Sequence, residues 1–475
     1  MKTFRNFVNG SFVDAKSGET TNVINPATGQ VYAQAVLSRE ADVDLAMRAA
    51  EHGAELWRDA TPGERSLALY RMADAVESRA EELIALEVEN TGKPIAITRS
   101  EEIPPMVDQM RFFAGAARNL EGKSAGEYMR GMTSFIRREP VGVCAQVAPW
   151  NYPMMMAVWK FAPALAAGNS IVLKPSDTTP ATTTLLAEIA AEFFPPGVFN
   201  VICGDRDTGR AMVTHNTPSM VSVTGSVRAG IEVAQAAATS LKRVHLELGG
   251  KAPVVVFDDA DIDSAVEGAM ASKYRNAGQT CVCANRIYVQ ESVYDTFVQK
   301  FAAKVKALKV GNGFEDGVVQ GPLIEPAALE KVTRHVEDAK AKGGVVLAGG
   351  KALNGQFFEP TVIGNATADM LCAKEETFGP FAPVFKFKTE QEAIDAANNT
   401  EFGLASYFYS RDVGRIFRVS EGLEYGMVGI NVGVIATEHV PFGGVKQSGL
   451  GREGSHHGMD EYLEMKYLCM GDILK

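Results

Sequence analysis

The sequence is poor in cysteine, in basic residues and in long apolar runs. Its six cysteines are too few and too irregularly spaced for a disulfide framework, which predicts a reducing, cytoplasmic environment. No uncharged apolar run has the length of a membrane span, and residues 1–10 contain no apolar stretch of signal-peptide length, so we expect no membrane association. Because 47 basic residues against 58 acidic ones leave a net charge of −11, nucleic-acid binding is also disfavoured.

What is present is the pattern of an α/β protein. After an extended start, apolar residues at three- and four-residue spacing predict helices over 41–60, 63–90 and 101–121. From residue 141 onward, short apolar runs alternate with helical stretches, which predicts a parallel sheet covered on both faces, with strands at 141–148, 170–173, 199–202, 220–223 and 244–248. A second series of strands and helices begins at 253–257 and runs through 426–432. We therefore expect two α/β units that meet near residues 249–250.

Two glycine-containing segments are candidates for a nucleotide site. Residues 449–454 fit the spacing G-x-G-x-x-G, but no strand precedes them and no βαβ unit follows, so we interpret them as a glycine-rich loop. In residues 221–230 a strand ends at Gly225-Ser226 and a helix begins, and the N–H groups of its first turn could hold a pyrophosphate. An ordinary helix cap at Ser226 is the alternative.

Lys174 ends another expected strand, and Pro175 turns the chain there. Open α/β sheets bind ligands at this carboxyl edge, so Lys174 and Asp177 could meet ribose hydroxyl groups. A solvated lysine at a strand end is the alternative interpretation. If Asp177 faces the adenosine ribose, its charge disfavours a 2′-phosphate, which favours NAD over NADP.

A cysteine follows a glycine in the loop Asn276-Ala-Gly278-Gln-Thr-Cys281, where Gly278 lets the backbone approach a ligand. Cys281 is therefore a candidate nucleophile, although a free cysteine is as often a small buried apolar residue. Cys283 lies close by, but C-x-C without a second pair of ligands does not complete a zinc site, and we expect no metal.

A cysteine nucleophile needs a base and an oxyanion donor. Strand alternation places His245 and Glu247 on one face of an apolar strand, where burial would raise the pKa of Glu247 toward that of a general base. Asn151 lies in a loop fixed by two prolines, which leaves its amide as a neutral donor for an oxyanion. Taken singly, a solvated carboxylate and an ordinary turn asparagine are the alternatives.

Together these segments resemble the aldehyde dehydrogenase family over essentially the whole chain. The resemblance implies an α/β fold with a Rossmann-like NAD-binding domain (1–120 and 141–249), an α/β catalytic domain (250–445) and a small β oligomerisation element (121–140 and 446–475). It also implies a homodimer or homotetramer that uses NAD, or NADP, on a small-molecule aldehyde. The segments that carry the resemblance are 149–153, 173–176, 224–226, 247–251, 278–281, 375–380 and 441–444.

The resemblance assigns roles to individual residues. It makes Cys281 the nucleophile, Glu247 the general base that activates water, and Asn151 the donor to the oxyanion of a thiohemiacetal that is oxidised to a thioester. Cofactor contacts are implied at Trp150, Lys174, Ser176, Asp177, Gly225, Ser226, Glu376 and Phe378.

Substrate choice is divided between two subfamilies. Residues 101–174 look like the aminobutyraldehyde and betaine-aldehyde dehydrogenases, whereas residues from 273 onward look like the succinate-semialdehyde dehydrogenases. In the second group an arginine matching Arg275 binds the distal carboxylate, but its other two contacts are replaced here by Trp159 and Ala436. Asp108 and Trp159 would instead suit a cationic amine, and Arg275 could be a helix C-terminal cation. We expect a small ω-semialdehyde such as succinate semialdehyde, with an aminoaldehyde as the alternative.

Four further hypotheses follow from the same residues. The two-sided resemblance suggests a hybrid chain, natural or engineered, which a single relative spanning both halves would contradict. Cys281 and Cys283 could form a regulatory disulfide, with a packed Cys283 as the alternative. Outside this family, the chain could be a hydrolase that pairs Cys281 with His245, or a non-catalytic binding protein.

Overall fold

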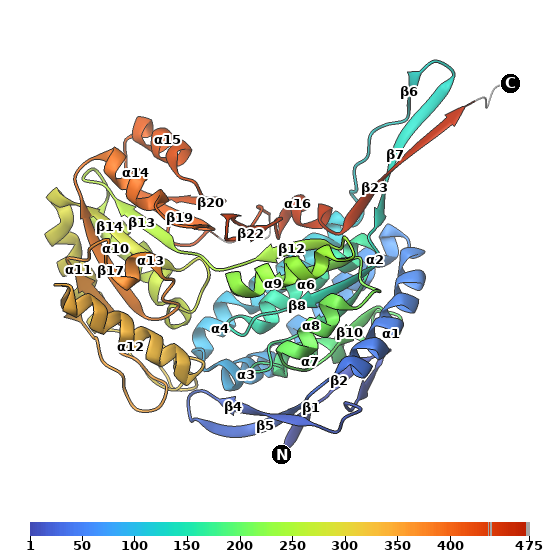
Figure 1. The fold of residues 1–475 in the computed structure, drawn as a ribbon, viewed down its shortest axis with the longest axis horizontal. Helices are drawn as coiled ribbons and strands as arrows, with labels where there is room; N and C mark the ends of the chain where they lie inside the picture. Colours follow the sequence, from blue (N-terminus) through green and yellow to red (C-terminus); the bar gives the residue numbers. More distant parts are fainter. Residues whose placement is uncertain (436, 438, 472–475) are drawn as a thin grey trace.

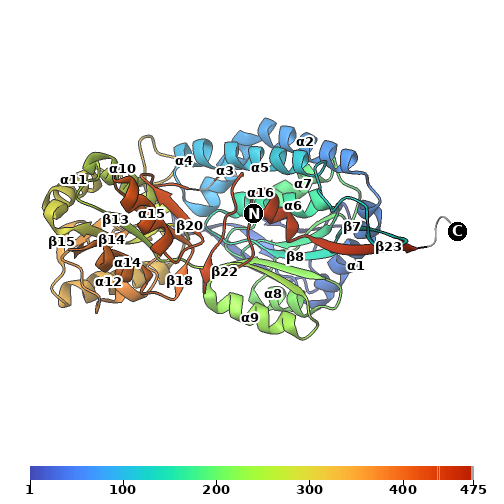
Figure 2. The same cartoon turned by 90° about the horizontal axis from the view of Figure 1, so that it is seen from above.

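The computed structural model describes residues 1–435, 437 and 439–471 as two α/β lobes and a projecting arm (Figures 1 and 2). An eight-stranded sheet forms the first lobe and a seven-stranded sheet the second. The first sheet includes β12 (Arg243–Glu247), and the second begins with β13 (Ala252–Val256). The predicted α/β class is therefore confirmed.

The first sheet has the strand order β22-β12-β11-β8-β9-β10-β2-β3. Its five central strands are parallel, so their carboxyl ends share one edge, as in other ligand-binding α/β sheets. They are β8 (Val143–Val147), β9 (Ser170–Lys174), β10 (Phe199–Val201), β11 (Met220–Thr224) and β12, each at its expected place. Antiparallel strands complete the edges, namely β2 (Asn6–Val8), β3 (Ser11–Val13) and β22 (Gly449–Leu450).

Both faces of this sheet are covered by helices. Cys144 and Ile171 belong to the core on one face, whereas the neighbouring residues Val143 and Val172 belong to the core on the other. This alternation explains why the strands are apolar without interruption. The first face packs against α2 (Pro62–Ser78), α3 (Ala80–Thr91), α5 (Ile103–Ala116), α6 (Pro153–Ala167) and α7 (Ala181–Ala190), and the second against α1 (Glu40–Arg58), α8 (Arg206–Thr214) and α9 (Val227–Ala238). None of the helices in the described ranges is long and apolar enough to cross a membrane.

The helical run expected over 63–90 is two helices rather than one. Thr61 and Glu64 form a capping box at the start of α2, and Arg79 separates α2 from α3 with a backbone outside the helical region (φ −102°, ψ 20°). Gly92 ends α3 with a left-handed φ of 74°, a conformation in which glycine carries no steric cost. The short α4 (Ile95–Glu101) follows and leads directly into α5.

The second lobe has the strand order β15-β16-β17-β14-β13-β19-β20. Its strands are parallel except for β15. Besides β13 they are β14 (Ala284–Gln290), β15 (Val345–Ala348), β16 (Thr361–Gly364), β17 (Phe381–Phe387), β19 (Ala405–Tyr409) and β20 (Met427–Ile430). The helices of this lobe are α10 (Ile262–Tyr274), α11 (Tyr294–Lys306), α12 (Pro326–Ala341), α13 (Leu371–Lys374), α14 (Glu390–Asn398) and α15 (Val413–Gly422). Its helices and sheet build two apolar cores of their own.

The arm is a three-stranded antiparallel sheet that projects beyond the first lobe (Figures 1 and 2). It consists of β6 (Gly126–Met129), β7 (Met132–Pro140) and β23 (Leu463–Gly471). Within the segment 446–475, β23 belongs to the arm, whereas β22 joins the first sheet and α16 (Ser455–Asp460) contacts α6. A separate small sheet is formed by β1 (Lys2–Phe4), β4 (Thr20–Asn25) and β5 (Gln30–Val36).

A glycine lets α1 lie directly on the chain that enters β10. A Cβ atom at Gly53 would come within 2.2 Å of the Gly197 carbonyl carbon, so no side chain fits there without a backbone shift. We expect Gly53→Ala to destabilise the first lobe by about 1–3 kcal/mol and to lower the thermal unfolding midpoint. The control is Gly63→Ala, since a Cβ at this helical glycine would lie 3.7 Å from its nearest neighbour. Equal midpoints for the two variants would contradict the close packing.

Candidate active site

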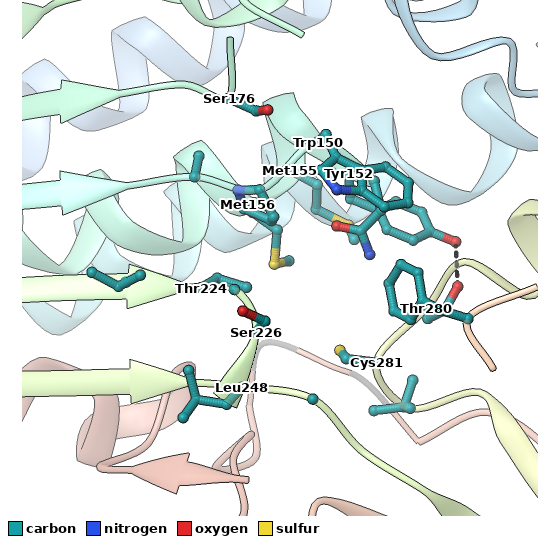
Figure 3. Close-up of a pocket in the computed structure, with 18 of the residues that line it drawn as sticks. Trp150, Tyr152, Met155, Met156, Ser176, Thr224, Ser226, Leu248, Thr280 and Cys281 are labelled. Atoms are coloured by element: carbon teal, nitrogen blue, oxygen red, sulfur yellow. Dashed lines mark hydrogen bonds between the residues drawn. The ribbon is translucent and has the colours of Figure 1, made fainter. Parts of the chain in front are cut away.

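A cavity of about 1400 Å³ is lined by residues from both lobes (Figure 3). Trp150, Ser176 and Ser226 follow parallel strands of the first sheet, and Cys281 enters from the loop after α10 in the second lobe. Pockets for drug-sized ligands measure about 300–1000 Å³, so this cavity has room for more than one small molecule. It brings together many of the predicted site residues, namely Trp150, Asn151, Trp159, Lys174, Ser176, Asp177, Gly225, Ser226, Arg275, Cys281, Glu376 and Phe378.

The start of α9 suits the phosphate groups of a dinucleotide. The Ser226 side chain accepts a hydrogen bond from the Ala229 N–H at 3.3 Å and so caps the helix, as the alternative interpretation of this residue expected. The first turn contains no acidic residue, and Arg206, Arg210 and Arg228 line the same cavity. Free helix N–H groups and cations are the chemistry that a pyrophosphate requires, so the residues present fit a dinucleotide.

Lys174 is buried rather than solvated. Its ammonium group donates hydrogen bonds to the carbonyl oxygens of Gly204 and Pro175, at 2.6 and 2.9 Å, and burial lowers the pKa of the amine. Ser176 is half-buried and Asp177 is exposed, with the Ser176 hydroxyl donating to the Asp177 carboxylate at 3.3 Å. The Asp177 carboxylate, expected to meet a ribose, therefore stands beside the Ser176 hydroxyl at the end of β9, whereas the Lys174 ammonium group is engaged by backbone carbonyls.

Glu376 and Phe378 come from the second lobe and face the first. The Glu376 carboxylate accepts a hydrogen bond from the Gly250 N–H at 3.0 Å, and burial raises the pKa of this acid. Phe378 has a left-handed φ of 54°, and its ring meets the Trp150 indole edge to face at a centroid distance of 5.4 Å. Together these contacts connect the two lobes beside the cavity.

The loop that carries Cys281 is tightly constrained. Asn276 and Ala277 adopt left-handed backbone angles, with φ of 48° and 54°, which is uncommon for residues with side chains. Gly278 continues the turn at φ 74°, where a Cβ would lie 2.2 Å from the Gly379 carbonyl oxygen. A Cβ at Gly250 would similarly lie 2.4 Å from the Cys281 carbonyl oxygen. Gly278 therefore permits a close approach, although to the backbone of Gly379, and Gly250 permits a second one at Cys281 that was not predicted.

The Cys281 thiol is held in its protonated form. Burial raises the pKa of the thiol, and the carboxylates of Glu247, Glu376 and Glu453 raise it further. The Val282 N–H opposes this shift through its hydrogen bond to the sulfur. A cysteine in this environment is a thiol at neutral pH, so it must lose its proton before or during nucleophilic attack.

Asn151 lies against the same loop. Its side-chain amide donates to the carbonyl oxygen of Gln279 at 3.0 Å, and the Asn276 amide donates to the carbonyl oxygen of Asn151 at 3.1 Å. These two bonds fix the amide beside Cys281 in the cavity lining. The amide nitrogen carries a second N–H besides the one bonded to Gln279, so Asn151 remains a candidate donor to an oxyanion.

Glu247 is buried behind the cavity, as the strand alternation predicts. Neither carboxylate oxygen has a hydrogen-bond partner among the described residues, and burial raises the pKa of the acid well above its ordinary value. Glu453 raises this pKa further, while Lys160 opposes the shift. Lys160 donates to the Glu453 carboxylate at 2.9 Å inside the protein. Sequence reasoning missed this pair, although a lysine within the otherwise apolar α6 was a signal for it.

His245 does not reach the cavity. Its Nδ1 shares a hydrogen bond with the Ser222 hydroxyl at 2.9 Å, and burial lowers the pKa of the imidazole to about 3. The residue that the hydrolase alternative pairs with Cys281 therefore belongs to the interior of the first sheet.

Cys283 also turns away from the cavity lining. Both Cys281 and Cys283 are free thiols, and the Cys283 sulfur lies 3.4 Å from the Lys273 ammonium group in the interior. The disulfide expected between Cys281 and Cys283 would require Cys283 to leave this lysine, and it stays a prediction.

The region around Arg275 contains an acidic partner that sequence reasoning missed. The Arg275 Nε atom lies 2.5 Å from the Glu101 carboxylate, and both residues line the cavity together with Trp159. Asp108, the acidic group expected here, lies on the exposed side of α5 and outside the lining of this cavity. Ala436 lies outside the described residues.

The first lobe is a parallel sheet covered on both faces, and the ends of its strands share one cavity with a cysteine loop from the second lobe. This arrangement is typical of two-lobed nucleotide-binding enzymes. The model of the aldehyde dehydrogenase family matches residues 12–468. Glutarate-semialdehyde dehydrogenase of Pseudomonas putida is 47% identical, covering 98% of this chain and 97% of that protein. Succinate-semialdehyde dehydrogenase [NADP(+)] of Escherichia coli is 44% identical, covering 98% and 97%. Betaine aldehyde dehydrogenase of Staphylococcus aureus, solved in complex with NAD+, has a TM-score of 0.96 and 37% identity, covering 99% and 96%.

The chain belongs to the aldehyde dehydrogenase family. It is an NAD(P)-dependent aldehyde dehydrogenase, so the resemblance read from the seven segments is confirmed. The hybrid hypothesis is wrong by its own criterion, because single relatives at 47% and 44% identity span both halves of the chain.

The raised thiol pKa predicts how Cys281 reacts with an alkylating agent. Only the thiolate is nucleophilic, so inactivation by iodoacetamide should be slow at pH 7 and should accelerate about tenfold per pH unit up to pH 9. Residual NAD-coupled activity and peptide mapping of Cys281 provide the measurement. Cys283→Ala should leave this profile unchanged, because Cys283 does not line the cavity. A plateau near pH 7 would show that the thiolate already forms there.

Proposed function

We propose that the protein oxidises a short aldehyde with a distal carboxylate, of which succinate semialdehyde is the model, to the corresponding dicarboxylic acid. The observation that carries this proposal is that Arg275 and Cys281 line one cavity. Cys281 forms a bond to the aldehyde carbon, and the Arg275 guanidinium binds the carboxylate at the other end of the same short molecule. The printed activities of the glutarate- and succinate-semialdehyde relatives support this substrate class.

Cys281 performs the first chemical step. Its sulfur attacks the aldehyde carbon, the thiol proton passes to solvent water, and the π electrons of the carbonyl bond move onto the oxygen, which becomes an oxyanion. The Asn151 amide donates a hydrogen bond to this oxyanion, and one such donor contributes about 3 kcal/mol in other enzymes. The resulting thiohemiacetal is held on the loop that Gly250 and Gly278 fix from both sides.

The cofactor and Glu247 complete the reaction. Lys174, Ser226 and Glu376 hold the dinucleotide, which when bound supplies the hydride acceptor for the oxidation to the thioester. Glu247 then takes a proton from water, and the hydroxide attacks the thioester carbon and releases the acid and the Cys281 thiol. Its raised pKa suits this role, since a base with an ordinary carboxylate pKa would hold the proton too weakly.

An aminoaldehyde is the second candidate substrate. It is favoured by the Glu101 carboxylate and by the Trp159 indole, because an anion and an aromatic face both attract an ammonium group. Arg275 opposes it, because a permanent cation at the same wall would repel the amine.

We also propose that the lobes and the arm correspond to the domains expected from the sequence. Residues 1–120 and 141–249 bind the cofactor, residues 250–445 carry the nucleophile, and residues 121–140 with β23 mediate assembly into a homodimer or homotetramer in the cytoplasm. Of the expected segment 446–475, β22 and α16 belong instead to the first lobe, and residues 472–475 lie outside the described residues. The arm supports this role because it exposes apolar side chains on a narrow sheet, a typical interface feature, including Tyr128, Met129, Met465 and Tyr467.

Glu247→Gln should separate acylation from deacylation. The amide cannot take a proton from water, so we expect one equivalent of NADH per active site in a rapid burst. The steady rate should then be lower by about 10²- to 10⁴-fold. Stopped-flow absorbance measures both phases, and Cys281→Ala, which should give no burst, is the control. Normal steady turnover of Glu247→Gln would show that another group activates water.

The substrate class is tested by comparing succinate semialdehyde, 4-aminobutyraldehyde, betaine aldehyde and butanal. We expect the first to have the highest kcat/KM in the wild type, and Arg275→Met to lower this value about 100-fold while butanal changes little. Arg99→Met is the matched control, because Arg99 pairs with Glu81 on the surface at 2.7 Å. A wild-type preference for either amine substrate would replace the carboxylate proposal with the aminoaldehyde one.

A further inference from the structure

Three residues of the cavity lining carry buried N–H donors that make no hydrogen bond within the described part of the chain. They are Nε2 of Gln109 on α5, Nε1 of Trp159 on α6 and Nε of Arg275, and none has a hydrogen-bond partner among the described residues. All three residues line the same cavity. Leaving one buried donor unsatisfied costs about 1–3 kcal/mol. Arg275 Nε has Glu101 as an ion-pair partner, so the donors of Gln109 and Trp159 are the ones that indicate a site that a ligand completes.

Glu101 is the anion that pairs with this wall in the free protein. Its carboxylate lies 2.5 Å from the Arg275 Nε atom, yet the N–H is not aligned for a hydrogen bond to it. The Glu101 side chain is 41% exposed, whereas that of Arg275 is only 19% exposed. Glu101 can therefore swing into solvent at little cost, while Arg275 stays in the wall.

The layer behind Arg275 is fixed. Lys93 is fully buried between Glu87 and Glu102, at 2.8 and 2.6 Å, and lies 4.4 Å from the Tyr152 ring centroid. Arg275 lies over the same ring at 5.7 Å. Burial raises the pKa of Glu102, and Lys93 holds its carboxyl group at 2.6 Å, so Glu102 is not free to move to Arg275. Glu101 is thus the exchangeable anion of this wall.

We propose that Glu101 is a specificity-determining residue that occupies Arg275 in the free enzyme and is displaced by the distal carboxylate of the substrate, which then also accepts hydrogen bonds from Gln109 and Trp159. The inference rests on the proposed function and adds the residues that replace the two missing carboxylate contacts. No covalent bond changes, because one carboxylate replaces another beside the guanidinium. A neutral aldehyde cannot make this exchange, and an ammonium group would place a second cation beside Arg275.

Glu101→Gln tests the displacement. Because the competing carboxylate is gone, Arg275 is free for a larger fraction of the time. The ratio of kcat/KM for succinate semialdehyde over butanal should therefore rise about 3- to 30-fold, mainly through a lower KM. Glu81→Gln is the matched control, since it removes the same charge from the surface pair with Arg99. A fall in the ratio, or the same ratio as the wild type, would overturn the proposal.

Binding without turnover gives a second, independent readout. Succinate is a non-reactive dicarboxylate, and its protection of Cys281 against iodoacetamide reports occupancy of the wall. We expect Glu101→Gln to lower the succinate concentration needed for half-protection about 3- to 30-fold. Gln109→Leu and Trp159→Phe should each raise it about 5- to 20-fold. Thermal unfolding midpoints identify variants that fail to fold. If folded Gln109→Leu and Trp159→Phe need the same succinate concentration as the wild type, these two side chains do not bind the carboxylate.

The two proposals fail in different ways. If the wild type prefers butanal or an amine to succinate semialdehyde, the proposed function fails. If the wild type prefers succinate semialdehyde but Glu101→Gln binds succinate no more tightly, only the displacement fails. A selective loss of 4-aminobutyraldehyde activity in Glu101→Gln would show that Glu101 binds the ammonium group directly, and this too would overturn the displacement.

Discussion

The site depends on the close backbone contact between the two lobes at Cys281. Gly250, in the segment that joins the lobes, lies so near the cysteine carbonyl that a Cβ would approach it to 2.4 Å, and Gly278 meets Gly379 as tightly. Rigid contacts of this kind hold a nucleophile within the few tenths of an ångström that preorganised catalysis requires. The left-handed backbone of Asn276 and Ala277 is the local strain that this placement requires.

Burial around this contact decides the protonation of the reacting groups. The thiol of Cys281 and the carboxyl group of Glu247 both have raised pKa values, and ionised Glu247 raises the pKa of the thiol. The free site therefore disfavours two adjacent anions, and deprotonation of the thiol is coupled to the charge of its neighbours. The Lys160–Glu453 pair behind Glu247 supplies the cation that moderates this coupling.

The sequence predicts the strands, the glycine turns and the cysteine loop because each follows from local chemistry. Apolar runs between helices specify a covered parallel sheet, and the alternation in β12 correctly buries Glu247. The single helix expected over 63–90 was wrong because periodicity does not register the break at Arg79. Gln109, Lys160 and Glu453 were missed because their importance depends on neighbours distant in the sequence. Asp108 was expected to meet a cationic substrate because of its charge and of the resemblance of residues 101–174 to the aminoaldehyde group, and neither defines which side of α5 lines the cavity.

The pair Glu101-Glu102 shows most clearly what the sequence leaves open. The two residues are chemically almost equivalent, but they lie at the junction of α4 and α5, where consecutive side chains point in different directions. Glu102 is fully buried and clamps Lys93, which fixes the junction and the Tyr152 wall. Glu101 remains half-exposed beside Arg275, so it is free to exchange. Glu102 stays fixed by Lys93, and only the half-exposed Glu101 has to leave Arg275. The wall can therefore bind an anion without moving its buried groups.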